Sequence, residues 1–394
     1  MKKITGRLVS WASILDEKAE EQARRTATMP FIHPHVALMP DAHLGLGATV
    51  GSVIPTLRSV MPAAVGVDIG CGMIAVRTQF TREQVLARAA EGHGLRTLRE
   101  QIERAIPLSA GSYNRKIVAT AEPRVAELAA LAVRRGFDPA QYAGNWELQL
   151  GTLGSGNHFI EVSVDESDAV WMFLHSGSRG VGNKIAQHHI RVAQQLAERW
   201  WIPLPDRDLA YLVEGTEEFR RYIDELAWAQ HFALLNREEM MDRVARQLSE
   251  WMGEVVEERE RINCHHNFTQ REEHFGKSVW LSRKGAISAR EGELGLIPGS
   301  MGTASYVVEG RGNAMSLCSS PHGAGREYSR SAARKTFSQD DLRQAMAGIE
   351  FRDTDAFIDE IPAAYKPIDR VMADAADVVT VRHTLRQLVN VKGD

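Results

Sequence analysis

A carboxylate and a thiol stand three residues apart in one glycine-flanked turn. The segment GVDIGCGM (66–73) carries Asp68 and Cys71, and a turn of this kind lets both side chains face one point. A carboxylate and a thiolate that face one point can bind a metal ion. The alternative is a turn aspartate beside a buried free cysteine with no chemistry, since free cysteines are commonly buried.

Three further segments supply histidines in similar loops. His158 lies in GTLGSGNHFIEV (151–162), His175 in FLHSGSRGVGNK (173–184), and NCHHNF (263–268) holds an adjacent pair. Each histidine alone is as well explained as a structural residue. Together with Asp68 and Cys71 they indicate a metal centre. No CxxC pair is present, so the pattern disfavours structural zinc and favours a catalytic first-row metal such as Mn²⁺ or Zn²⁺.

Other glycine-rich loops offer sites for anions and a possible nucleophile. Ser178, Arg179 and Asn183 stand at a helix entry, where backbone N–H groups and an arginine can bind an anion. PGSMGT (298–303) is a small-residue loop that a phosphate or base could approach. His322, in CSSPHGAGREYSR (318–330), could be a general base, a metal ligand, a nucleophile on phosphorus, or a turn residue without chemistry.

Asp41 and His43 lie in a further glycine-rich segment, MPDAHLGLGATVG (39–51). Its glycine spacing is GxGxxxG rather than GxGxxG, and it leads into an apolar run typical of a strand. A dinucleotide-binding site is therefore not indicated here.

Helices and strands must bring these loops together. Apolar residues at intervals of three and four predict amphipathic helices, with Pro362 and Pro367 interrupting the last one. Short β-branched runs predict strands. No internal repeat or linker divides the chain, and chemistry-bearing loops extend from residue 41 to 325, so one domain is expected. The expected helices are 81–107, 121–136, 183–202, 215–260 and 339–375, and the expected strands are 48–54, 63–69, 73–78, 158–164, 170–174, 278–282 and 305–310.

Composition is that of a globular protein. The 394 residues are 44% hydrophobic and 25% charged, with 47 basic and 51 acidic side chains, so any polyanion site must be a local patch. Three cysteines are too few for a disulfide framework. No stretch has the roughly 20 apolar residues needed to span a bilayer, and the N-terminus does not read as a signal peptide. A cytoplasmic location is expected.

The motifs as a set resemble the RtcB family of RNA-splicing ligases, and its bacterial branch most closely. The resemblance runs in the family's order from about residue 30 to the end, although residues 100–145 show no placed motif. The segments that carry it are MPDAHLGLGATVGSVIP, PAAVGVDIGCGM, LGTLGSGNHFIEV, LHSGSRGVGN, INCHHN, RKGAISAREG, IPGSMG, HGAGR and the terminal VKG.

This resemblance implies a fold and an activity. The fold is a single α+β domain over residues 1–394, with central β-sheets flanked by helices and the site in a central cleft. The activity joins an RNA 3′-phosphate or 2′,3′-cyclic phosphate to an RNA 5′-hydroxyl, with GTP as cosubstrate and two Mn²⁺ ions per chain. RNA is then the partner, in tRNA processing or the repair of other cleaved RNA, with no membrane involved.

The resemblance also assigns roles to residues of this sequence. His322 would be the nucleophile that carries GMP. One Mn²⁺ would be held by Asp68, Cys71 and His158 and the other by Cys71, His175 and His266. Arg179 and Asn183 would contact an RNA phosphate, and Asp41 and His43 would assist at the RNA end. The implied guanylate pocket is Asn157, His158, Phe159, Ile160, Glu161, His266, Asn267, Pro298, Gly299, Ser300, Met301, Ser305, His322, Gly323, Ala324, Gly325 and Lys392.

Two positions depart from the family pattern around the nucleophile. Pro321 fixes φ and removes a backbone donor directly before His322, and Tyr328 stands where methionine is usual. Neither change touches an implied ligand. Two other functions remain open: an RNA end-binding protein without ligation, and a metal-dependent 2′,3′-cyclic phosphodiesterase.

Overall fold

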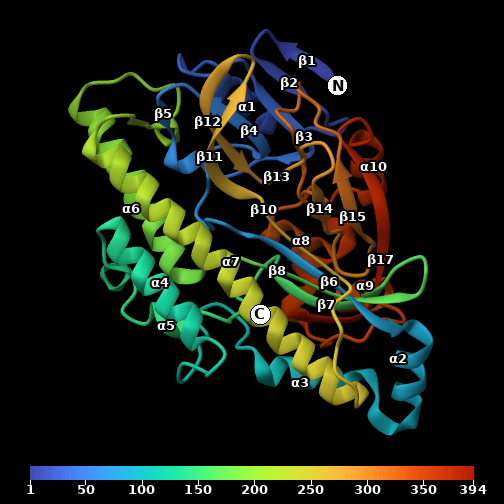
Figure 1. Cartoon of the computed structure of the whole chain (residues 1–394). Coiled ribbons are helices and arrows are strands. Elements are labelled where there is room, and N and C mark those ends of the chain that lie inside the picture. The colour runs from blue at the N-terminus through green and yellow to red at the C-terminus, as the bar shows by residue number, and fades with distance from the viewer.

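The computed structural model describes all residues from Met1 to Asp394 and combines two large β-sheets with helices on their outer faces (Figure 1). The sheet orders are β1-β2-β3-β4-β12-β11 and β10-β6-β8-β7-β17-β15-β14. The α+β class expected from the sequence is therefore confirmed. The strands of these two sheets are β1 (Lys2–Thr5), β2 (Leu8–Ser10), β3 (Val36–His43), β4 (Val50–Thr56), β6 (Gly72–Thr81), β7 (Phe159–Val164), β8 (Ala169–Ser176), β10 (Glu260–His265), β11 (Asn267–His274), β12 (Lys277–Lys284), β14 (Leu294–Ile297), β15 (Ser305–Gly310) and β17 (Val379–Lys392).

The largest apolar core lies between the two sheets. Val53 and Leu281 of the six-stranded sheet pack in one cluster with Met73 and Phe173 of the seven-stranded sheet. Successive residues of β6 alternate, so Ile74 enters a different core on the opposite face of its sheet. The seven-stranded sheet is thus buried on both faces, which explains its continuous apolar strands.

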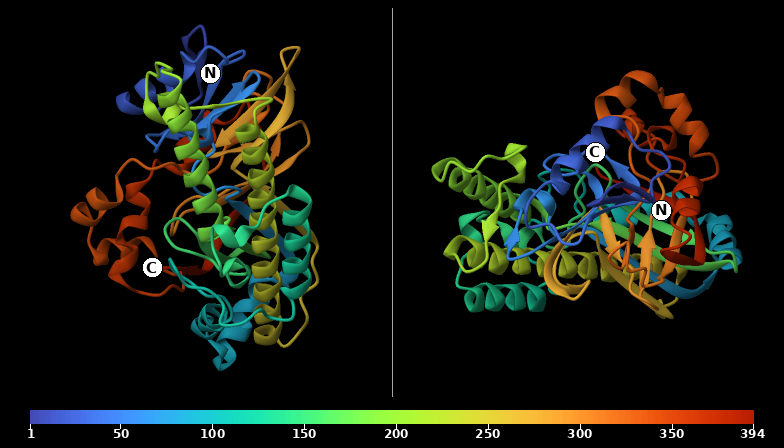
Figure 2. Two further views of the ribbon diagram at one scale, coloured as in Figure 1. Left: turned by 90° about the vertical axis from the view of Figure 1, so that its left-hand side faces the viewer. Right: turned by 90° about the horizontal axis from the view of Figure 1, so that it is seen from above.

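Helices cover the outer faces of both sheets. The long helix α7 packs on β6 and β8 and contacts α3, α4 and α6, so it forms the base of a helical layer (Figures 1 and 2). The helix α1 covers part of the six-stranded sheet, because Ala23 packs with Leu38 and Ile54. The helices are α1 (Glu17–Ala27), α2 (Arg82–Arg88), α3 (Leu95–Ala105), α4 (Glu122–Arg135), α5 (Trp146–Gln149), α6 (Arg179–Arg199), α7 (Glu217–Met252), α8 (Arg330–Thr336), α9 (Gln339–Ala345) and α10 (Ile368–Asp374).

Short elements complete the fold. Two small sheets pair β5 with β9 and β13 with β16, and the second of these ends at the residue before His322. No helix is long and apolar enough to cross a membrane. The remaining elements are β5 (Ser59–Val60), β9 (Leu212–Val213), β13 (Ala286–Ser288), β16 (Ser319–Pro321), 3₁₀ turns at Pro62–Ala64, Pro139–Gln141, Arg207–Leu209, Asp355–Glu360 and Pro362–Ala364, and a π turn at Ala89–His93.

Most predicted elements form, and the exceptions have local causes. The prediction of a strand over 63–69 is wrong: a 3₁₀ turn at Pro62–Ala64 leads into a loop in which Gly66 and Gly70 take positive φ. The helix predicted over 215–260 ends at Met252, where Gly253 adopts the left-handed conformation typical of a helix C-terminus. The helices predicted over 81–107 and 339–375 are each interrupted, the second one between α9 and α10.

Candidate functional site

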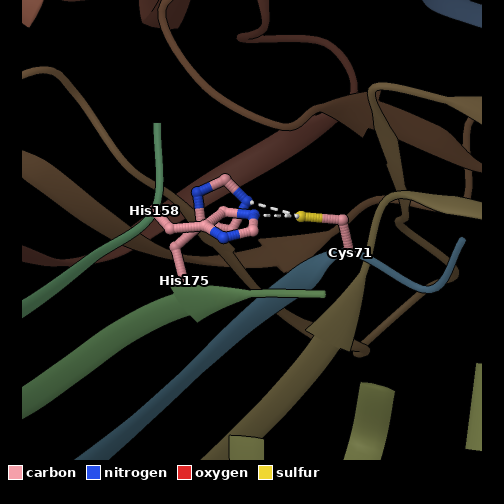
Figure 3. A group of neighbouring side chains, drawn as sticks. All are labelled: Cys71, His158 and His175. Atoms are coloured by element: carbon pink, nitrogen blue, oxygen red, sulfur yellow. Dashed lines mark hydrogen bonds between the residues drawn. The ribbon is translucent and has the colours of Figure 1, made fainter. Parts of the chain in front are cut away.

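Five side chains predicted to bind metal converge between the sheets. Cys71 Sγ lies 3.3 Å from His158 Nε2 and 3.2 Å from His175 Nε2 (Figure 3). His158 Nε2 is in turn 3.0 Å from Asp68 Oδ2. His175 Nε2 is 2.9 Å from His266 Nε2. Contacts therefore link all five groups in one series, with the thiol of Cys71 at its centre.

Hydrogen bonds fix which ring nitrogens face this centre as acceptors. His158 Nδ1 is 2.8 Å from the Leu153 carbonyl oxygen, which can only accept, so in the neutral ring Nε2 carries a lone pair. Asn267 Oδ1 accepts from the Gly285 N–H, so His266 Nδ1, at 3.2 Å, donates to that oxygen as well. His266 Nε2 therefore also presents a lone pair.

Lone pairs that face a carboxylate, a thiol and one another repel unless a proton or cation lies between them. Burial holds the pKa of His175 and His266 well below the usual value, so both rings are neutral. Burial would raise the pKa of Asp68, but a proton shared with His158 Nε2, together with the charge of Arg179, lowers it to about 2, and a cation in the place of that proton would also keep the carboxylate ionised. One carboxylate, one sulfur and three imidazoles fit a first-row divalent metal ion.

Two buried polar residues of α7 hold the loops that carry these ligands. Asn236 accepts from the N–H of Gly151 and Thr152 and donates to the Gly177 carbonyl oxygen, 3.1 Å away. Arg237 donates to the carbonyl oxygens of Gly70, at 2.7 Å, and Ser176, at 3.2 Å. Gly70 directly precedes Cys71, and Ser176 directly follows His175. Gly151 and Thr152 begin the loop that carries His158. Both α7 side chains are completely buried.

His322 lies beside the cluster and is oriented by a carboxylate. Its ring centroid is 4.4 Å from that of His266, and its Nδ1 is 2.6 Å from Asp41 Oδ2, which also accepts from the His322 backbone N–H. Because Nδ1–H donates a hydrogen bond to the carboxylate, the neutral ring carries its proton on Nδ1, and Nε2 is left with the lone pair that a nucleophile needs. Asp41 was expected near the RNA end, but its side chain is completely buried and contacts His322 instead.

A cavity of about 390 Å³ opens onto His322 and the metal-ligand cluster. The central cleft expected from the sequence thus exists. Most residues expected in the guanylate pocket line it, along with His43 from the expected RNA contacts. These lining residues are Asn157, Phe159, Glu161, His266, Asn267, Pro298, Gly299, Ser300, Met301, His322, Gly323, Ala324, Gly325 and Lys392.

A few expected site residues lie elsewhere. The side chain of Ile160 packs in the core between the seven-stranded sheet and α7, facing away from the cavity. Ser305 is buried behind the cavity wall, where its Oγ accepts from the Gly299 N–H at 3.3 Å. Asn183 lies on α6 and accepts from Gln187, away from the cavity. Arg179 donates to Thr152 Oγ1 at 3.0 Å and does not line the cavity, although its charge helps to lower the pKa of Asp68.

Two titratable groups of the expected set occupy the buried part of the cavity. Burial raises the pKa of Glu161 to about 8, and its Oε2 has no hydrogen-bond partner. Lys392 lies beside it with its Nζ 3.4 Å from Glu360 Oε2. The terminal lysine, which by position alone suggests only a solvated tail, is thus 4% exposed and part of the site.

Comparison with known proteins decides the family. A family model described as tRNA-splicing ligase RtcB matches residues 22–393. The chain belongs to the RtcB family. It is 48% identical to the RNA-splicing ligase RtcB of Escherichia coli K12, with 96% of this chain and 95% of that protein covered. It is 32% identical to the tRNA-splicing ligase RtcB of Pyrobaculum aerophilum, with 95% and 92% covered.

The departures from the RtcB pattern lie beside His322 and leave the cluster intact. Pro321 is the last residue of β16 and pairs with Ala286 of β13 in a two-stranded antiparallel sheet. Tyr328 is 38% exposed and packs its ring 5.4 Å from that of Phe337. Neither contacts a member of the metal-ligand cluster.

Sequence reasoning did not find several residues of this RtcB site. Arg326, Arg330, Glu360, Tyr365 and Asn390 all line the cavity. Arg326 stands at the end of the HGAGR motif, and that position was a usable signal. Arg330 ends the segment CSSPHGAGREYSR and Asn390 directly precedes the terminal VKG, whereas Glu360 and Tyr365 come from segments without a recognisable motif.

Proposed function

We propose that this chain is an RNA ligase that joins an RNA 3′-phosphate or 2′,3′-cyclic phosphate to an RNA 5′-hydroxyl, with GTP as cosubstrate. The observation that carries the proposal is His322: in a chain of the RtcB family, a carboxylate holds its ring with Nε2 available, beside a metal-ligand cluster in a cavity.

The residues of the chain support a nucleotidyl transfer through His322. Its Nε2 attacks the α-phosphorus of GTP, an N–P bond forms, and the P–O bond to pyrophosphate breaks. An oxygen of the RNA 3′-phosphate then attacks the same phosphorus, and the imidazole leaves. The oxygen of the 5′-hydroxyl finally attacks the phosphorus of the activated 3′-phosphate: a new P–O bond forms, the P–O bond to GMP breaks, GMP leaves, and the hydroxyl proton passes to solvent. Throughout the first two steps Asp41 stabilises the ring by accepting a hydrogen bond from Nδ1–H.

Two Mn²⁺ ions fit the proposed ligand set. Asp68, Cys71 and His158 would hold one ion and Cys71, His175 and His266 the other, in keeping with the central place of the sulfur in the series of contacts. Such ions stabilise charge that develops on transferring phosphoryl groups. The thiol would bind as a thiolate, although burial alone raises its pKa well above the usual value.

The guanylate is proposed to bind along the seven-stranded sheet. Glu161 comes from β7, Lys392 from β17, and the loop Pro298–Met301 joins β14 to β15. The Oε2 of Glu161 has no partner and can accept from the N–H edge of guanine. This group of residues is called the guanylate side below.

The RNA contacts and the setting of the enzyme are further parts of the proposal. Arg179 and Asn183 would bind an RNA phosphate and His43 would assist there, which the position of His43 in the cavity wall supports. One catalytic domain over residues 1–394 is supported by a cavity that draws on residues from His43 to Lys392. A cytoplasmic location agrees with three unpaired cysteines.

Incubation with labelled GTP and Mn²⁺ tests the function. We expect the protein to acquire covalent GMP without RNA, and then to join a 3′-phosphate RNA to a 5′-hydroxyl RNA on a gel. An RNA end-binding protein would acquire no label. A cyclic phosphodiesterase would open 2′,3′-cyclic ends to a 3′-phosphate and stop, and either result would contradict the ligase.

The bridging place of Cys71 leads to a separate prediction. Cys71→Ser should weaken both metal sites, because a serine hydroxyl is a poorer anionic ligand than a thiolate. We expect fewer than two tightly bound Mn²⁺ per chain by calorimetry and a loss of GMP attachment of about 100-fold or more. Cys264→Ser, at a cysteine outside the cluster, is the matched control. Two tightly bound ions in Cys71→Ser would contradict the bridge.

A further inference from the structure

The cavity has a second side, which comes from the six-stranded sheet and its neighbouring loops. His43 and Val50 come from the ends of β3 and β4, and Lys284 from the end of β12. Leu46 and Val67, from the loops that follow β3 and Pro62–Ala64, complete its outer part. The guanylate side belongs to the other sheet, so apart from the proposed role of His43 at an RNA phosphate this half of the cavity is without an assigned ligand.

Leu46 and Val67 are exposed apolar residues at this edge. Leu46 is 86% exposed and Val67 is 36% exposed, and both line the cavity. Exposed apolar residues scattered over a surface need no explanation, whereas apolar residues grouped at the edge of a cavity are typical of a ligand contact. We call Leu46 and Val67 the apolar rim.

The two loops that carry the apolar rim are held in place by their backbones. The buried Lys284 ammonium donates to the carbonyl oxygens of Leu46 and Ala63, so it ties one loop to the other. Gln22 donates to the Gly45 carbonyl oxygen at 2.8 Å and accepts from the Gly45 N–H. The Leu46 side chain is therefore presented to solvent from a fixed backbone, and little ordering is needed when a ligand binds.

The close approach of the two loops depends on glycine. Gly47 has a φ of 82°, and a Cβ there would lie 2.7 Å from the Ala63 side chain. A bulkier residue would therefore separate the loops that Lys284 joins. The close approach of the two loops that carry Leu46 and Val67 is thus a built feature of the cavity edge.

We infer that the apolar rim binds the base of the RNA nucleotide that carries the terminal 3′-phosphate. The inference rests on the proposed ligase function, in which that phosphate must reach the phosphorus on His322. The His322 ring borders this half of the cavity, since a Cβ at Gly285 would lie 2.4 Å from Val50 and 2.9 Å from His322 Cε1.

A flat apolar contact suits this ligand. Every base has an apolar face, so a leucine and a valine can hold it without reading its edge, and an enzyme that repairs many broken ends needs such tolerance. A nucleotide whose phosphate lies at His322 and whose base lies on the apolar rim would occupy the side of the cavity opposite to the guanylate side.

The test compares RNA binding with GMP attachment in Leu46→Ser. We expect the Kd for a short RNA with a 3′-phosphate, measured by fluorescence anisotropy without GTP, to rise roughly fivefold. The rate of GMP attachment without RNA should stay as in the unchanged protein. Val255→Ser, at a residue that is 77% exposed and remote from the cavity, is the matched control and should alter neither quantity.

An RNA whose 3′-terminal nucleotide lacks its base gives the decisive comparison. The unchanged protein should bind this RNA about as weakly as Leu46→Ser binds the intact RNA, and the variant should show no further loss. If Leu46→Ser weakened the binding of intact and abasic RNA equally, the inference would be overturned. Slower GMP attachment in Leu46→Ser would also overturn it and would assign the apolar rim to GTP.

Two outcomes separate this inference from the proposed function. If the unchanged protein acquires no GMP, the ligase function itself fails. If it acquires GMP and joins RNA while Leu46→Ser binds RNA normally, only the assignment of the apolar rim fails, and a protein partner would then be the remaining class of ligand for it.

Discussion

His322→Ala is expected to abolish covalent attachment of GMP to the protein. The ring is the nucleophile in the proposed reaction, and no other imidazole of the cavity has a carboxylate on Nδ1 that leaves Nε2 available. Incubation with labelled GTP and Mn²⁺ followed by mass spectrometry should find the adduct on His322 in the unchanged protein and none in the variant. A phosphoramidate is labile in acid and stable in base, and the adduct should behave in this way.

The His322→Ala variant should keep its metal binding and the final joining step. The five proposed metal ligands are other residues, so His322→Ala should still bind two Mn²⁺. It should also join RNA whose 3′-end has been guanylylated in advance. Ser320→Ala removes the hydroxyl nearest in sequence, and this control should keep the adduct. An adduct that persists in His322→Ala, or that maps to another residue, would contradict the mechanism.

The sequence predicted the chemistry of the loops better than their backbone conformation. The segment 63–69 was expected to be a strand because Val65, Val67 and Ile69 are apolar. In the structure Val65 and Ile69 are buried, but in a loop whose glycines take positive φ so that Asp68 and Cys71 face the cluster. Apolar residues report burial, and burial in a loop cannot be distinguished from burial in a strand by composition.

Residues that act through others left the weakest signal. Asn236 and Arg237 are buried polar residues in a helix of 36 residues, and only the tertiary structure shows that they hold the loops of three proposed metal ligands. The position of Lys392 suggests only a solvated tail, and its place in the guanylate pocket came from the family resemblance alone; the pairing of β17 with β7 is what brings it to Glu161. Contacts between residues so far apart in sequence cannot be read from local patterns.

Asp41 is a clear example, because its sequence motif suggested a place at the RNA end and in the structure its carboxylate contacts the His322 ring. We expect Asp41→Asn to slow GMP attachment by about 100- to 10,000-fold. The amide removes the negative charge that stabilises the ring while Nε2 bonds to phosphorus. In one of its two orientations the amide also places an NH₂ against the His322 N–H groups, which disfavours the required tautomer.

The measurement is the single-turnover rate of GMP attachment at saturating GTP, with Mn²⁺ binding and the midpoint of thermal unfolding measured on the same sample. A role in positioning His322 predicts a slow rate with both metal ions still bound and the fold retained. Asp374→Asn is the matched control: it alters a carboxylate on α10 that accepts from the Ser13 N–H and does not line the cavity, and it should attach GMP at the usual rate. If Asp41→Asn also attached GMP at the usual rate, the carboxylate would not be the group that prepares His322 for attack. Another contact of the ring would then have to leave Nε2 available.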